Sequence, residues 1–261
     1  MKRSWGWRLR RAAAILVVVA LADAIIVEPR WVERTRVSIH APLKSPLHVL
    51  HITDLHGSGL GTRERAVLRA IDEEKPDVVV LTGDTVDSGT FQPYAAFLGA
   101  LHAPLGVYAV AGNWEHWRPA ADEDATWSAA GIVVLRNEAR RLRDDVWVVG
   151  FDDSTAGSPD VERALASVPP GVATLALFHS PILFERLAGR VSVALAGHTH
   201  GGQVRLPLVP PLWLPQGSGR FVEGKYEDRG SMLYVSRGVG TSIAPVRFFC
   251  RPEVAVVEVA P

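Results

Sequence analysis

The chain has 261 residues, 48% of them hydrophobic and 21% charged, with 28 basic and 28 acidic side chains. This composition excludes a disordered chain, and the length suits one α/β domain or two small ones. The single cysteine, Cys250, excludes a disulfide framework within the chain and a cysteine-based zinc site. Five of the 28 cations lie in the first eleven residues, which leaves 23 basic against 28 acidic groups in residues 23–261. No nucleic-acid partner is therefore expected.

Residues 1–29 are predicted to be a membrane anchor or a signal segment. The five cations of its tip are Lys2, Arg3, Arg8, Arg10 and Arg11. An apolar run with one charged residue, Asp23, follows over residues 12–27. As an anchor, this run would place Trp31 at headgroup level; as a signal peptide, it would be cleaved at the small-residue site 20–22. A buried helix is the third interpretation, although cations at a helix N-terminus oppose its dipole.

The first two interpretations share one topology. The positive-inside rule keeps the basic tip in the cytoplasm and sends residues 30–261 to the outer face. We therefore expect a single-pass protein of the cell membrane whose main domain lies on the periplasmic or extracytoplasmic side, unless the segment is cleaved.

The rest of the chain is predicted as an extended linker, 30–46, and one domain, 47–261. Apolar runs typical of strands alternate with helical patterns, which indicates βαβ units and layers built around sheets. The strand-like runs are 47–53, 78–82, 107–111, 132–135, 146–150, 173–178, 193–196, 232–236 and 254–259. Helices are expected over 62–74, with Thr62 as its cap, and over 91–101 and 122–130. The four prolines of 206–215 predict an apolar loop.

Five of the predicted strands end in polar side chains that can bind metal: Asp54, His56, Asp84, Asn113, His179, His198 and His200. Open α/β sheets place ligand sites beyond the carboxyl ends of their strands. A spacing of two puts both members of the pairs Asp54/His56 and His198/His200 on one face of an extended segment, so each pair can share a metal.

The residue types define the metal chemistry that we expect. Imidazole and carboxylate donors without thiolates suit two divalent ions such as Mn, Fe or Zn, and the many histidines argue against Ca or Mg. Two such ions about 3.5–4 Å apart can activate a shared hydroxide and hold a phosphoryl oxygen for in-line attack. The sequence thus predicts hydrolysis of a phosphoester.

In their order along the chain, DLH at Asp54–His56, GD at Asp84, GN at Asn113, the isolated His179 and the block GHTHGGQ around His198 resemble the calcineurin-like metallophosphoesterase superfamily. The resemblance, which runs from about residue 47 to the C-terminus, implies an α/β (α+β) fold, a four-layer αββα sandwich of two mixed sheets flanked by helices. It also implies a set of roles. Asp54, His56 and His200 would hold the first metal, Asp84 would bridge, and Asn113, His179 and His198 would hold the second.

The N-terminal segment, the letters RLP after GHTHGGQ and the ending RFFCRPEVAVVEV resemble the membrane-anchored bacterial branch of this superfamily. That branch includes lipid-phosphate and nucleotide-sugar-lipid pyrophosphohydrolases. We therefore expect attack by a metal-bound hydroxide on a phosphodiester or pyrophosphate, on a lipid-linked or nucleotide-sugar substrate. The alternatives are a soluble exported phosphodiesterase acting on nucleotides or cell-wall phosphate, and a metal-binding pseudoenzyme. The oligomeric state is left open.

One block departs from the family pattern, in which a histidine follows Gly-Asn and protonates the leaving group. Here Trp114 occupies that position, and an indole cannot supply this proton. Either His116, two residues on, acts as the acid beside the bridging Asp84, or the leaving group departs without one, as from phosphoanhydrides and aryl esters. Trp114 and Arg205 are the candidate substrate-binding residues. Asp152 and Asp153 are expected in a supporting turn, His51 as a packed residue and Cys250 as a buried thiol.

Overall fold

The computed structural model describes residues 3–87 and 89–261, so Lys2 of the predicted tip lies outside the described residues. The first of two six-stranded sheets has the order β1-β12-β2-β3-β4-β5, and its neighbouring strands are parallel except for the antiparallel pair β12 and β2. Its strands are β1 (Glu33–His40), β12 (Glu253–Ala260), β2 (Leu47–Ile52), β3 (Val78–Thr82), β4 (Val107–Val110) and β5 (Val133–Val134).

The second sheet has the order β10-β11-β9-β8-β7-β6 and is parallel from β11 to β7, with an antiparallel strand at each edge. Its strands are β10 (Gly224–Asp228), β11 (Ser231–Val235), β9 (Val193–Ala196), β8 (Ala173–Leu177), β7 (Val146–Gly150) and β6 (Glu138–Arg143). Both sheets are therefore mixed, as predicted.

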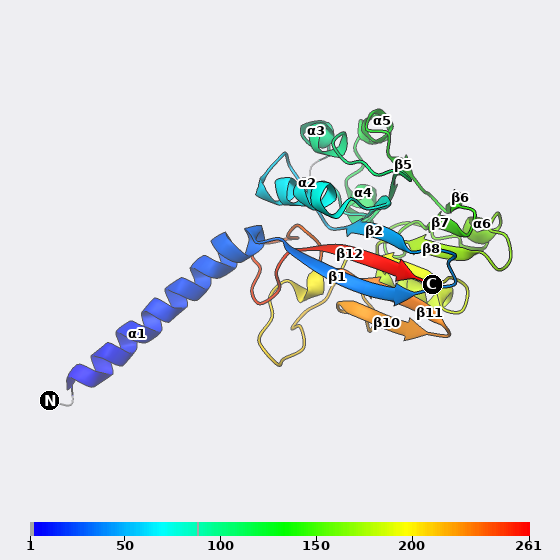
Figure 1. Cartoon of the computed structure of the whole chain (residues 1–261). Helices are drawn as coiled ribbons and strands as arrows, with labels where there is room; N and C mark the ends of the chain where they lie inside the picture. The colour runs from blue at the N-terminus through cyan, green and yellow to red at the C-terminus, as the bar shows by residue number, and fades with distance from the viewer. Residues whose placement is uncertain (1–2, 88) are drawn as a thin grey trace.

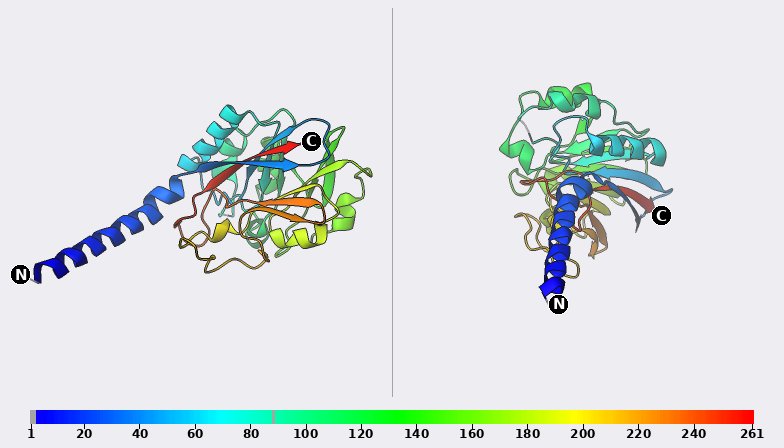
Figure 2. Two further views of the ribbon diagram at one scale, coloured as in Figure 1. Left: turned by 60° about the horizontal axis from the view of Figure 1, so that its bottom comes forward. Right: turned by 90° about the vertical axis from the view of Figure 1, so that its left-hand side faces the viewer.

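Helices cover the outer faces of the two sheets (Figures 1 and 2). The helices on the first sheet are α2 (Thr62–Glu74), α3 (Ala95–Leu98) and α5 (Glu123–Ala129), and those on the second are α6 (Val161–Leu165) and α7 (Phe184–Leu187). Short helical turns are η3 (Gln92–Tyr94), η4 (Pro181–Leu183) and η5 (His200–Gly202), and α4 (Asn113–Trp117) follows β4. The predicted four-layer αββα sandwich is confirmed.

Burial explains the hydrophobic pattern of the strands. All five residues of β3 are buried, because one face of its sheet meets the second sheet and the other meets the helices. In α2 the buried residues Val67, Ala70 and Ile71 recur at helical spacing. The expected cap at Thr62 is wrong: Thr62 is the first helical residue, Gly61 precedes it, and the Glu64 carboxylate accepts the Gly61 N–H at 2.8 Å.

The N-terminal helix α1 (Arg3–Ala22) extends away from the body (Figure 1). A π-helical turn, η1 (Asp23–Val27), and a 3₁₀ turn, η2 (Glu28–Arg30), continue it up to the body. Within the described part of the chain, one helical stretch, Trp5–Arg30, is long and apolar enough to cross a membrane by its length and composition. Most of its side chains from Trp5 to Val27 are exposed, which fits a membrane anchor.

Residues 33–40, expected in an extended linker, are extended but belong to the domain. They form β1, which pairs in parallel with β12 over eight residues and buries Val37 and Ile39 in the core between the sheets. The alternating burial of this strand's second half is that of an edge strand with one face on the core.

Candidate metal centre

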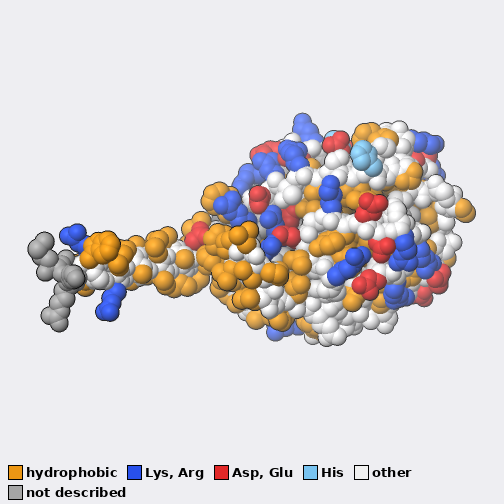
Figure 3. Space-filling model, turned by 90° about the horizontal axis from the view of Figure 1, so that it is seen from below, with side chains coloured by type: hydrophobic (Ala, Val, Ile, Leu, Met, Phe, Trp, Pro, Cys, Tyr) orange, Lys and Arg blue, Asp and Glu red, His pale blue; other side chains and the backbone are white. Residues whose placement is uncertain are grey.

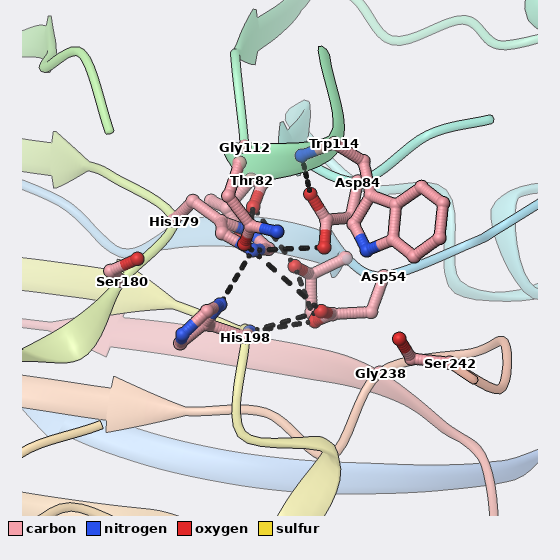
Figure 4. Close-up of polar contacts among 12 residues, drawn as sticks. Asp54, Thr82, Asp84, Gly112, Trp114, His179, Ser180, His198, Gly238 and Ser242 are labelled. Carbon is pink, nitrogen blue, oxygen red and sulfur yellow. Dashed lines mark hydrogen bonds and ion pairs between the residues drawn. The ribbon is translucent and has the colours of Figure 1, made fainter. Parts of the chain in front are cut away.

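The predicted strand ends meet at one edge of the sandwich. Loops after β2, β3 and β4 of the first sheet face loops after β8 and β9 of the second. Figure 4 shows His179, from the second sheet, pointing toward the carboxylates of Asp54 and Asp84, from the first, and the ring of His198 pointing toward that of His179. Six of the seven predicted ligands form two compact groups: Asp54, His56 and His200, and Asp84, His179 and His198.

In the first group, one nitrogen of each histidine points at the same space. His56 Nε2 and His200 Nε2 lie 3.2 Å apart, and His200 Nε2 is 3.3 Å from Asp54 Oδ1. The Asp54 side chain is held in turn by the backbone N–H of His198, at 3.1 Å to Oδ1 and 2.9 Å to Oδ2. All three side chains are buried.

The second group has the same character. His179 Nε2 lies 3.2 Å from Asp84 Oδ2 and 3.1 Å from His198 Nδ1. Asn113, the seventh predicted ligand, places its side-chain oxygen 3.1 Å from His179 Nε2. The structure thus brings all seven predicted residues together.

Asp84 lies between the two groups. Its Oδ2 is 3.2 Å from His179 Nε2 and 3.7 Å from His56 Nε2. Its other oxygen, Oδ1, accepts the backbone N–H of Trp114 at 2.9 Å. One carboxylate oxygen within reach of both groups is the arrangement that a bridging ligand requires.

Hydrogen bonds on the far side of three rings set which nitrogen faces the centre. His179 Nδ1 lies 2.7 Å from the Thr82 carbonyl oxygen and His198 Nε2 lies 2.7 Å from that of Gln216, so each of these nitrogens donates a proton outward. His56 Nδ1 lies 2.5 Å from Asp87 Oδ1. In the neutral form of these three rings the unprotonated nitrogens therefore point inward, which is the ligand geometry of metal-bound histidines. The donor set fits two divalent ions.

Electrostatics at the centre favour a cation. Burial alone would raise the pKa of the Asp54 carboxyl, but the surrounding histidines lower it to about 2. Burial would lower the pKa of His179, but the carboxylates of Asp84 and Asp54 hold it well above its usual range. Burial lowers the pKa of His200 well below its usual value. The site thus keeps anionic carboxylates in a buried place, where a positive charge stabilises them.

The backbone at the centre is strained. Five of the predicted ligands have a positive φ: Asp54 (50°), His56 (44°), Asp84 (53°), His198 (72°) and His200 (50°). Such conformations cost of the order of 1–3 kcal/mol each and cluster at functional sites. Two glycines allow the backbone to approach the carboxylates of Asp54 and Asp84 closely. A Cβ on Gly197 would lie 2.3 Å from Asp54 Oδ2, and one on Gly112 would lie 2.3 Å from Asp84 Oδ1.

Two supporting carboxylates were not found from the sequence. Glu115 accepts the backbone N–H groups of Asp84 (3.0 Å), Thr85 (2.7 Å) and Gly112 (2.8 Å), and so ties the loop after β3 to the loop after β4. Burial and the neighbouring Asp84 raise the pKa of Glu115. Asp87 orients His56, as described above. Glu115 carries a signal, since it stands three residues after Gly112 at the start of α4 and takes a capping-box position.

Other sequence expectations concern supporting residues. Asp153 Oδ1 accepts the Ser180 hydroxyl at 2.5 Å next to His179, so this turn supports the site. His51 is fully buried, with Nε2 2.8 Å from Thr82 Oγ1, and burial lowers its pKa to about 4. Cys250 is a buried thiol near the His200 carbonyl oxygen, at 3.2 Å.

The residues predicted to contact substrate lie in different places. Trp114 lines a pocket of about 540 Å³ above the centre, and its ring meets the His56 ring edge-on at 5.4 Å between centroids. His116 does not line this pocket; its Nε2 lies 2.6 Å from Asp152 Oδ1, and this hydrogen bond raises the pKa of His116. Arg205 also lies outside the pocket lining and pairs with Glu223.

The pocket joins the centre to an apolar wall. Asp84, Asn113, His198 and His200 line its base. The apolar side chains of its wall include Trp114, Trp117, Val204, Leu212, Trp213 and Ile243. A substrate can thus present a phosphate to the centre and an apolar group to the wall.

Two facing mixed sheets, covered by helices and carrying two buried Asp/His groups at one edge, are the features of a phosphoesterase with a candidate dinuclear metal site. A family model for the calcineurin-like phosphoesterases matches residues 47–202, and the chain belongs to this family. It is 34% identical over 248 residues to the phosphodiesterase YaeI of Escherichia coli, covering 88% of this chain and 89% of that one. It is 31% identical over 245 residues to the metallophosphoesterase YkuE of Bacillus subtilis, covering 88% and 86%.

Two further comparisons concern the anchor and the fold. A bovine transmembrane protein with a metallophosphoesterase domain is 30% identical over 290 residues, covering 97% of this chain and 63% of that one. A structure assigned as a 5′-nucleotidase from Staphylococcus aureus superposes with a TM-score of 0.52 at 10% identity, covering 83% of this chain and 55% of that one. This last likeness concerns the fold alone. The chain is a metal-dependent phosphoesterase.

Proposed function

We propose that this phosphoesterase hydrolyses a phosphodiester or pyrophosphate that carries an apolar group, such as a lipid-linked phosphate, at the outer face of the cell membrane. The observation that supports this most is the pocket. Metal-binding side chains form its base, while two tryptophans of α4 and the apolar residues Leu212, Trp213 and Ile243 form its wall. A free phosphate needs no such wall.

Two bound divalent ions would supply Lewis-acid activation of water and of the phosphoryl oxygens; Mn, Fe or Zn suit the donors. The chain's own residues orient these groups. Asp84 presents one oxygen to both histidine groups and is fixed by the Trp114 N–H through the other. The Asp54 carboxylate accepts the backbone N–H of His198 and so joins the loop after β2 to the loop after β9.

Substrates differ in whether their leaving group needs a proton donor in the protein. Trp114 lines the pocket without offering an imidazole, and His116 pairs with Asp152 outside the pocket lining. A phosphoanhydride or another good leaving group departs with little protonation, whereas an alkyl alcohol needs an acid. This favours a pyrophosphate among lipid-linked substrates. His116 remains the candidate acid if its ring turns from Asp152.

A matched pair of pyrophosphates tests the proposal. The full-length chain, loaded with Mn²⁺, is assayed with the short-chain lipid dihexanoyl CDP-diacylglycerol and with CDP-glycerol, which carries the same reacting phosphates without the acyl chains. Burying two or three methylene groups against the wall should raise kcat/KM about tenfold or more. An equal or higher kcat/KM on CDP-glycerol would overturn the apolar specificity and favour a nucleotide substrate. No turnover of either, or of an aryl phosphodiester, with two metals bound would favour the pseudoenzyme.

A further inference from the structure

A cluster of exposed apolar side chains lies at the end of the body from which α1 leaves. We call it the loop face; its members are Leu206, Leu208, Val209, Leu212, Trp213, Ile243 and Phe249. Leu208 is fully exposed, and Ile243 and Leu212 are 85% and 78% exposed. Figure 3 shows hydrophobic side chains gathered over the part of the body next to the helix. A contiguous exposed apolar patch usually marks a surface that contacts a membrane or another molecule.

The backbone holds these side chains outward at a cost. Leu208, Ile243 and Phe249 have φ values of 65°, 65° and 51°. Positive φ is uncommon for residues other than glycine, asparagine and aspartate, and for a β-branched residue such as Ile243 it is an outlier. Three large apolar groups are thus presented to solvent from conformations that favour small residues. Strain of this kind points to a function for the displayed side chains.

Hydrogen bonds join the two loops of the face into one platform. The Gln203 side chain donates to the carbonyl oxygens of Ser242 (3.1 Å) and Ala244 (3.0 Å) and accepts the Ser242 N–H at 2.8 Å. The Phe248 N–H donates to the Gln203 carbonyl at 3.0 Å, and the Arg205 N–H donates to that of Phe248 at 2.8 Å. The base of the loop of residues 204–213 is therefore bonded to the loop of residues 241–249.

The end of the anchor is bonded to this same platform. Buried Glu28 accepts the backbone N–H groups of Phe249, at 2.9 Å, and Cys250. The Arg247 N–H donates to the Ala24 carbonyl at 2.9 Å. Trp31, just beyond, carries the Arg251 guanidinium 3.9 Å from its ring, and such amphipathic groups suit the headgroup level. The end of the anchor is thus bonded directly to the loop that carries Phe249.

We propose that the loop face rests on the lipid surface that α1 enters, so that Leu206, Leu208 and Phe249 lie among the lipids. Figure 1 supports this placement, because the loop after η5 reaches toward the side into which α1 extends. Leu212, Trp213 and Ile243 belong to both the loop face and the pocket wall. The mouth of the pocket therefore opens against the bilayer. This contact does not depend on the substrate proposed above.

Nitroxide labels on the full-length chain in phosphatidylcholine–phosphatidylglycerol liposomes test the contact. Labels at Leu208→Cys and Ile243→Cys are compared with one at Asp144→Cys, an exposed position in the turn between β6 and β7 at the far end of the body. Buried Cys250 is controlled by treating the wild-type chain with the label. At the loop face, collision with a water-soluble nickel complex should fall about fivefold or more relative to Asp144, while collision with oxygen rises. Equal nickel access at Leu208 and Asp144 would overturn the proposal.

A second measurement links the contact to catalysis. The variant Leu206→Asp/Leu208→Asp changes two residues outside the pocket lining. Its turnover of a water-soluble aryl phosphodiester should equal that of the wild type, while its turnover of dioleoyl CDP-diacylglycerol in liposomes should fall about fivefold or more. Unchanged turnover in liposomes would overturn the orientation of the pocket. Inactivity of the wild type on both substrates would instead refute the proposed function and leave the label result to decide the contact.

Discussion

Among the contacts of the described residues, Asp84 is the one side chain whose oxygen lies within 3.7 Å of a histidine ring nitrogen from each of the two groups. Asp84→Asn replaces two anionic oxygens by one neutral oxygen. We expect turnover of an aryl phosphodiester to fall at least about 10²-fold, since several kcal/mol of transition-state stabilisation depend on the ions, and metal content to fall below two per chain. Elemental analysis beside turnover checks both. Asp124→Asn, at an exposed ion pair with Arg136, is the control. Two retained metals with near-normal turnover would remove Asp84 from the bridging role.

Substitutions of Trp114 and His116 test how the leaving group is protonated. If His116 leaves Asp152 and acts as the acid, His116→Ala should slow alkyl phosphodiesters far more than aryl ones, because a leaving group of low pKa needs little protonation. The plot of log rate against leaving-group pKa would then steepen. If the chain supplies no acid, the wild type already shows the steep slope and His116→Ala changes little.

The reciprocal substitution separates these two cases further. Trp114→His should restore alkyl-ester cleavage in the second case by part of the general-acid factor of about 10²–10⁴, because residue 114 lines the pocket. A slope near zero that survives both substitutions would contradict both versions and point to another donor or to rate-limiting product release.

At the scale of elements, the sequence predicted the central strands and the ligand loops but missed much of the periphery. Fully buried strands such as β3 and β8 can be predicted from their uninterrupted apolar residues alone. The edge strands β6 and β10 carry many charged residues, so their pattern resembles a loop. The short helix α4 was not predicted. The Glu115 partners Asp84 and Thr85, and the Asp87 partner His56, lie about 30 residues away in sequence. Contacts that depend on tertiary structure leave no local signal.

The edge strand β1 yields a test of the domain boundary. A fragment of residues 47–261 lacks β1, whereas a fragment of residues 31–261 retains it. Loss of β1 exposes the edge of β12 and removes the buried Val37 and Ile39, a cost of about 3–6 kcal/mol in the free energy of unfolding. We expect the shorter fragment to aggregate or to unfold at much lower urea than the longer one. Equal urea midpoints would show that 30–46 is a dispensable linker.

At the scale of the molecule, the centre joins the two sheets. The first sheet supplies Asp54, His56, Asp84 and Asn113, and the second supplies His179, His198 and His200. Ions bound between the sheets would hold them together in the folded chain and would find no such site in the unfolded chain. At a free metal concentration of about 100 times Kd, each occupied site would add about 2.7 kcal/mol to the free energy of unfolding.

Chelation should therefore lower the unfolding temperature of the whole chain. For a domain of this size, each kcal/mol shifts Tm by about 2–4 °C, so two sites would shift it by about 10 °C or more. Thermal unfolding with Mn²⁺ and after metal removal measures the shift, and His198→Ala, which removes one donor from the second sheet, should reduce it. The same Tm with and without Mn²⁺ would contradict a centre that joins the sheets.

The N-terminal helix and the charge distribution predict an orientation of the molecule. The cations at the tip of α1 precede the apolar stretch, and the body after it is mildly acidic, so by the positive-inside rule we expect the body on the outer face. The full-length chain should sediment with membranes, and protease added to intact spheroplasts should digest the body while leaving a cytoplasmic marker protein whole. A variant that moves cations to the other end of the chain carries Arg8→Glu/Arg10→Glu/Arg11→Glu and three lysines added after the C-terminus. In this variant the body should be better protected from the added protease. If the body of the wild type is digested only after lysis of the spheroplasts, it lies in the cytoplasm. If the body is recovered in the soluble fraction and has been cut at residues 20–22, the N-terminal segment is a cleaved signal peptide.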